Sequence, residues 1–283
     1  MNEIFNINRF WKYLVSEIKS VAGKYGIVLL VTSLSPIILY LTLGLGSVLL
    51  GRADGWYSAE WGWRLGLLFC VAIGLVISMP ANCFGHITDK RAGSSWLMIP
   101  ASTFEKTLGI LIVGCILMPA VFMLLYFSVD AIICAIDPNC GNSLVYYWHN
   151  LKEMIRMEIF DDPDVVGSDM EASLVSFMNL FTNNWFYIEQ IVYSILTFII
   201  GALYFKKNKA VKTIGVLFVL QIALSFASMP FGMSLEHRIL QVGNETALAE
   251  FLENLVVWVR VWNWCLIVGL SVWIYFRLKT IKH

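Results

Sequence analysis

The chain has 283 residues, of which 58% are hydrophobic and 14% are charged, and its formal net charge at pH 7 is zero. Soluble globular domains are about half apolar and about a quarter charged. This composition therefore argues against a soluble domain and indicates an integral membrane protein, as does the mean hydropathy of +0.71. The balanced charge gives no footprint for nucleic acid, so no nucleic-acid partner is expected.

Six apolar runs are long enough to cross a hydrocarbon core, which needs about 20 helical residues. They cover residues 26–50, 63–84, 107–133, 185–205, 213–230 and 256–276. Backbone polar groups in lipid are satisfied in helices or closed barrels, and no strand-type alternation of barrel length is present. The predicted fold is an all-α membrane protein with six spans. Four prolines are expected to kink or end these helices: Pro36, Pro80, Pro119 and Pro230.

Basic residues are typically concentrated in the cytosolic segments of membrane proteins. Most of the 20 lysines and arginines fall on one side if the N-terminus is inside. With an even number of spans, both termini are then cytosolic. A multi-pass protein of the cytoplasmic (inner) membrane, embedded in the lipid bilayer, is expected.

Residues 1–24 precede the first span and have a helical pattern of their own. Phe10, Trp11 and Leu14 lie on one face, with Arg9 and Lys12 opposite. Such a helix is suited to the headgroup region of the inner leaflet. Gly23 and Gly26 suggest a break before the span, and the alternative is an extension of the span itself.

Two segments on the outer side are long enough to have structure. Residues 137–184 form an extracytosolic loop with an acidic run, which is expected to be solvated because it lacks the spacing of a calcium-binding loop. Residues 234–255, between the last two spans, have apolar residues at helical spacing and predict an outer helical element.

Charged residues within membrane spans are costly and often functional. Four lie at similar depth in the outer part of their helices: Arg64, Asp130, Glu189 and Arg260. We hypothesise that at least one arginine–carboxylate pair forms among them and lines an outward vestibule. The alternative is that each side chain reaches the outer interface separately.

The cysteines and histidines do not suggest a metal site. Cys134 and Cys140 both follow the third span on the outer side, where a disulfide between them and two free thiols are both open alternatives. The four histidines are predicted at different locations, so no shared metal site and no directly bound cofactor are expected.

The connector between the second and third spans, residues 85–106, is short, charged and cytosolic. Ser102 and Glu105 match a capping box that would start the third span sharply after Pro100. Trp96 belongs to an apolar group before this start. The residues alone leave two interpretations open: a contact surface for a partner, or an ordinary loop with a well-capped helix.

No G-x-x-x-x-G-K-S/T phosphate loop is present, so the chain does not hydrolyse ATP by that route, and neither HExxH nor GxSxG occurs. An intramembrane enzyme would need a catalytic cluster within the spans, which the sequence does not reveal. The other alternative is a non-transporting accessory or sensor subunit, with the two outer segments as its receptors.

The connector resembles a signature of six-span permeases of type-2 ABC exporters, "(L/I)PAS" followed by "EK". The matching residues are Asp89-Lys90-Arg91, Met98-Ile99-Pro100-Ala101-Ser102 and Glu105-Lys106. The order of the amphipathic N-terminal helix, the six spans and the outer helical element is also similar, although the loop at 137–184 is longer than in a minimal member.

The resemblance implies a permease that works as a dimer with a second permease subunit. It also implies a separate ATP-binding subunit, which holds ATP and Mg. The connector would then be a coupling helix. The residues implied in coupling are Asp89, Lys90, Arg91, Trp96, Glu105 and Lys106.

Overall fold

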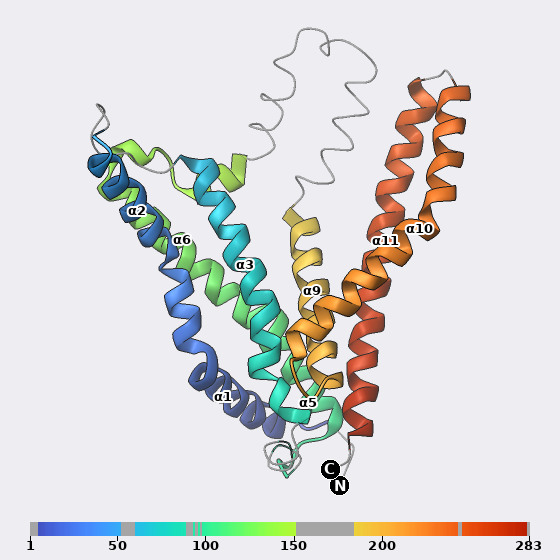
Figure 1. Ribbon diagram of the computed structural model, residues 1–283. Helices are drawn as coiled ribbons and strands as arrows, with labels where there is room; N and C mark the ends of the chain where they lie inside the picture. Colours follow the sequence, from blue (N-terminus) through green and yellow to red (C-terminus); the bar gives the residue numbers. More distant parts are fainter. Residues whose placement is uncertain are drawn as a thin grey trace.

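The computed structural model describes residues 5–51, 60–88, 93, 96, 98–150, 184–242 and 245–281. Every regular element in these residues is a helix (Figure 1). Six helical segments of the described chain are long and apolar enough to cross a membrane. The all-helical fold is therefore confirmed for this part of the chain, and the six candidate spans support the prediction of a multi-pass membrane protein.

The first span consists of α1 (Ile7–Ser33) and α2 (Ser35–Leu49). Asn6 caps α1 by accepting hydrogen bonds from two backbone N–H groups of its first turn. The expected break at Gly23 and Gly26 is wrong, because α1 runs through both glycines and ends at Ser33. The interruption lies at Leu34 instead, just before Pro36, whose fixed φ suits the first turn of a helix.

The second span is α3 (Trp61–Cys83), followed by a short 3-10 helix, η1 (Gly85–Thr88). Pro80 lies inside α3, and the helix ends three residues later at Cys83. Proline cannot donate a backbone hydrogen bond, so the expectation that it would kink or end the helix agrees with this early termination.

The third span combines α5 (Thr103–Leu111), a π-helical stretch η2 (Ile112–Leu117) and α6 (Met118–Ile136). The π-helical stretch ends immediately before the turn that contains Pro119. Proline has no N–H for the regular helical pattern, and widened turns are a common adjustment near such positions. A second short 3-10 helix, η3 (Pro138–Cys140), follows α6.

The last three helices are α9 (Asn184–Tyr204), α10 (Lys209–Val242) and α11 (Glu245–Thr280). Pro230 does not end α10, which continues to Val242. The predicted outer element at 234–255 is helical, as the extended ends of α10 and α11 rather than as separate helices. Residues 151–183 of the predicted extracytosolic loop lie outside the described residues.

The helices converge at the end of the bundle that contains α5 and both chain termini, and they spread apart toward the other end (Figure 1). α9 packs against α3, α10 and α11, while α11 also packs against α5. The buried core follows this arrangement, with the fully buried Phe84, Ile110 and Ile199 coming from three different spans. The convergent end thus places the connector beside the N-terminal helix.

Candidate functional site

The start of α5 is set by a reciprocal cap at Ser102. Its hydroxyl accepts a hydrogen bond from the backbone N–H of Glu105 at 3.2 Å, and its own N–H donates to Glu105 Oε2 at 2.8 Å. Both halves of the capping box are therefore present, as the sequence predicted.

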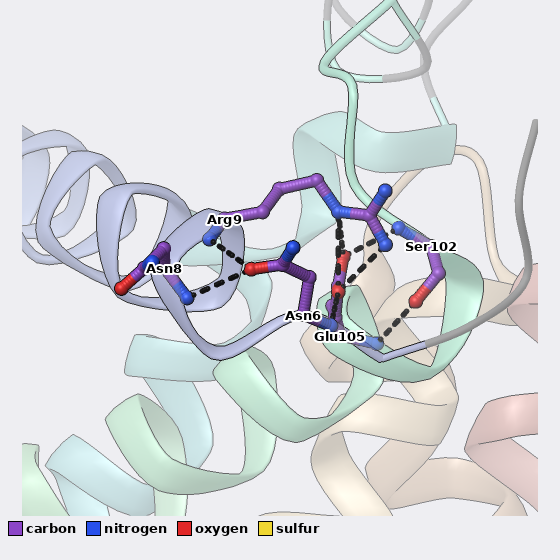
Figure 2. Close-up of polar contacts among 5 residues, drawn as sticks. All are labelled: Asn6, Asn8, Arg9, Ser102 and Glu105. Carbon is purple, nitrogen blue, oxygen red and sulfur yellow. Dashed lines mark hydrogen bonds and ion pairs between the residues drawn. The ribbon is translucent and has the colours of Figure 1, made fainter.

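Glu105 also binds the N-terminal helix, which no local pattern predicted (Figure 2). Arg9 Nη2 donates to Glu105 Oε1 at 2.7 Å, and Arg9 Nε donates to Oε2 at 2.8 Å. The backbone N–H of Asn6 adds a third donor, at 2.9 Å from Oε1. We call this group, Asn6, Arg9, Ser102 and Glu105, the clamp.

The clamp holds together two segments that are far apart in the sequence. The Glu105 side chain is fully buried, whereas that of Arg9 is 30% exposed. A two-pronged arginine–carboxylate contact is stronger and more directional than a neutral hydrogen bond, particularly away from water. The beginning of α1 and the beginning of α5 are consequently fixed to one another.

A second contact fixes the connector itself to α5. Lys106 Nζ donates to the carbonyl of Trp96 at 3.0 Å and lies 4.6 Å from the centre of the Trp96 ring. Both residues are buried. This geometry combines a charge-assisted hydrogen bond with a cation–π contact.

Of the six residues implied in coupling, the three that are described thus face inward. Trp96, Glu105 and Lys106 are buried, so they position the connector and offer little surface to a partner. Asp89, Lys90 and Arg91 lie outside the described residues. The exposed side chains of this region include Met98 and Phe104, at 83% and 52%.

A hollow of about 410 Å³ lies between α1 and the connector. Its lining includes Arg9, Lys12 and Ser16 from α1 and Ile99 and Pro100 from the connector. The buried ring of Tyr13, which also lines the hollow, packs directly against Gly109 of α5. The surface at this end of the molecule is therefore built jointly from both segments.

At the opposite end, Arg64 of α3 and Asp130 of α6 form a buried ion pair, with Nη1 and Oδ1 3.0 Å apart. Arg64 Nη2 also donates to the carbonyls of Cys140 and Asn142, at 3.0 and 2.9 Å. Asp130 Oδ2 accepts from the N–H of Leu144 at 2.7 Å. The pair joins two spans to η3 and the segment after it. Because both side chains are buried, the pair does not line an open vestibule.

Glu189 and Arg260 do not join this pair. Among the described residues, neither forms an ion pair, and Glu189 Oε2 and Arg260 Nε have no hydrogen-bond partner. The structure therefore brings together one of the two acids and one of the two bases that the sequence singled out.

Cys134 and Cys140 are free thiols, so the structure contains no disulfide between them. Their sulfurs belong to the Arg64 cluster instead: Arg64 Nη1 donates to Cys134 Sγ at 2.7 Å, and the Cys134 thiol interacts with Cys140. Burial raises the pKa of the Cys140 thiol to about 11. This thiol is consequently protonated at neutral pH.

No group of three or more His, Cys, Asp or Glu side chains within the described ranges is arranged to hold a metal ion. No protein-family model, curated protein or solved structure matches the chain. Because no similar protein indicates a function, the proposal below is based on the clamp and the surfaces around it.

Proposed function

We propose that the chain is the permease subunit of an ATP-driven exporter of the type-2 ABC class, in the cytoplasmic membrane. A separate subunit would bind ATP and Mg and deliver force to the connector. The observation that carries this proposal is the clamp, because it joins the connector to the N-terminal helix at one end of a six-helix bundle.

The clamp would transmit force because it links the connector to two spans. A push on an isolated loop is absorbed by the loop, whereas a push on the connector here reaches α1 through Arg9 and Glu105. It also reaches α5 through the capping box and the Lys106–Trp96 contact. Two spans would then move together, which is what a coupling element requires.

The hollow between α1 and the connector supports the same proposal. It is open and about 410 Å³ in volume. Its lining residue Ile99 directly follows the exposed Met98 in the sequence. Lys12 gives it a positive edge, whereas the charge of Arg9 is paired with Glu105. An acidic or apolar projection of an ATP-binding subunit would complement this surface.

A dimer of permeases is the second part of the proposal. The cavity between α1, α3, α6 and α9 is only about 60 Å³, and its lining is apolar, with Leu29, Met79 and Phe122 among its residues. It offers no polar passage. The described parts of α10 and α11 leave large apolar side chains exposed, including Phe218, Trp258 and Trp262, which suits contact with lipid or a second subunit.

The test is affinity purification of the full chain from its own membranes, followed by assay of ATP hydrolysis and identification of associated proteins. We expect a protein with a phosphate-loop motif to co-purify and to hydrolyse ATP. The variant Glu105→Gln should lower the recovered ATPase, whereas Lys19→Gln, on an exposed position of α1, should not. Recovery of the chain without any ATP-binding protein would favour the accessory or sensor alternative.

A further inference from the structure

A second polar pocket lies at the convergent end, between η1 and the turn that joins α9 to α10. Its volume is about 420 Å³. The lining includes Asn82 and His86 from the end of the second span and Lys206, Asn208 and Lys209 from the turn. It is separate from the clamp and has no part in the proposed coupling.

The pocket gathers cationic side chains. Lys206 and Lys209 line it directly, and Lys24 of α1 approaches from the side, with Nζ 3.3 Å from Nδ1 of His86. No acidic side chain is in the described lining. Glu17 of α1 interacts electrostatically with Lys24, which together with His86, Lys206 and Lys209 makes up the group of basic side chains. Such a group favours binding of an anion.

The local fold fixes this group in place. Lys209 Nζ donates to Thr88 Oγ1 at 3.0 Å and also to the carbonyl of Gly85. Gly85 leaves room for this approach, because a Cβ there would lie 3.0 Å from Lys209 Cδ. Asn208, with a φ of 51°, makes the turn that starts α10 at Lys209. The positive end of a 34-residue helix therefore faces the pocket.

An apolar surface leads away from the same pocket along α10. Val211 lines the pocket and is 70% exposed, and Ile214 and Phe218 follow on the same face at 44% and 66% exposure. Only 6% of the apolar stretch Lys209–Phe226 is buried. A molecule with an anionic group in the pocket could therefore continue directly into hydrocarbon packed on α10.

We propose that this pocket binds the phosphate headgroup of an anionic phospholipid, whose acyl chains lie along the exposed face of α10. Basic pockets between membrane helices are suited to such headgroups. The lipid would come from the leaflet on the side of the chain termini. It would fix the α9–α10 turn to the end of the second span.

The test uses the purified full chain and native mass spectrometry, with phosphatidylglycerol, phosphatidylcholine and inorganic phosphate as separate probes. The test variant is Lys24→Gln with Lys206→Gln. The matched control is Lys19→Gln with Lys279→Gln, which removes the same charge from exposed positions outside the pocket. A lysine near a lipid surface contributes about fivefold to binding, so the test pair should weaken phosphatidylglycerol binding roughly 30-fold.

We expect the control pair to bind phosphatidylglycerol like the unmodified chain, and phosphatidylcholine to bind weakly to all three proteins. Equal losses in the two pairs would overturn the pocket, because they would reflect surface charge alone. Binding of inorganic phosphate as tight as that of phosphatidylglycerol would overturn the lipid assignment. If the test pair does not fold, the variant Lys206→Glu takes its place, because it reverses one exposed charge. This variant must also show weaker binding of phosphatidylglycerol.

Discussion

Glu105 accepts hydrogen bonds from the backbone of Ser102 and Asn6 and from the side chain of Arg9. A helix cap needs only the first of these. The other two use the same carboxylate to hold a distant helix, so one side chain both starts α5 and determines where α1 begins.

The clamp predicts that Arg9 and Glu105 act as a unit. Glu105→Gln removes the negative charge and places an amide N–H against donors, so it should lower the thermal unfolding midpoint. Arg9→Gln should lower it as well, because it leaves the fully buried Glu105 carboxylate without its charged partner. In the double variant the second change should add little to the first. Thermal unfolding in detergent measures all three, and strictly additive losses would contradict a shared contact.

The Arg64–Asp130 pair gives a separate prediction at the opposite end. Both side chains are buried, at 4% and 1% exposure. Removal of one partner from a buried pair is expected to destabilise the protein by about 3–5 kcal/mol. Arg64→Leu should destabilise the protein more than a substitution of Asp130, because it also leaves the carbonyls of Cys140 and Asn142 without their donor.

Asp130→Asn is the matched milder variant, since its amide oxygen can still accept from the N–H of Leu144. Arg64→Leu combined with Asp130→Leu should recover part of the loss, because no buried charge remains unpaired. Unfolding midpoints that are unchanged in both single variants would show that the pair carries no stability.

Sequence patterns identified some of these residues and missed others, for a physical reason. The capping box is a local motif of four residues, so Ser102 and Glu105 could be recognised directly. The partner Arg9 lies 96 residues away from Glu105, and no local spacing reports such a contact. Similarly, the depth of charges in their spans suggested pairs, but only packing determines that Asp130 meets Arg64 while Glu189 does not.

Among the elements, α1 and α5 come very close together where Gly109 faces the Tyr13 ring. A Cβ at Gly109 would lie 2.5 Å from Cε1 of Tyr13, which is far inside normal contact. Tyr13 is buried, so its ring is confined by the side chains around it. The absence of a side chain at Gly109 is what allows the two helices to pack.

We therefore expect Gly109→Ala to destabilise the protein by about 1–3 kcal/mol through overpacking. Gly74→Ala is the matched control, because a Cβ at Gly74 of α3 would meet no atom within 4 Å, and alanine there should be neutral or mildly stabilising. Tyr13→Ala should relieve part of the overpacking in Gly109→Ala. Chemical unfolding of the variants measures these differences, and equal effects at the two glycines would contradict the close approach.

The ends of helices were predictable where the composition changes abruptly. They were not predictable where a helix continues beyond the end of its apolar run. The span at 185–205 nearly coincides with α9, because charged residues follow it immediately. The end of the fifth span was predicted at Pro230, yet α10 continues to Val242. Likewise, Gly23 and Gly26 weaken a helix without ending it, since glycine removes no backbone hydrogen bond.

For the whole molecule, the six spans and the positions of both termini at one end form a consistent arrangement (Figure 1). The connector, the N-terminal helix and the basic α9–α10 turn all lie at this convergent end. The described cavity between the spans is apolar, with Leu29, Met79 and Phe122 in its lining. The described contacts between the N-terminal helix and the connector lie at the convergent end.

The most direct measurement is site-specific photo-crosslinking at the convergent end in native membranes. A photoreactive amino acid replaces Met98, which is 83% exposed on the connector, and a matched control replaces Leu49, which is 84% exposed at the opposite end of the first span. We expect that position 98, and not position 49, crosslinks to an ATP-binding subunit. The absence of such a crosslink at position 98, in membranes that contain an ATP-binding subunit, would contradict it.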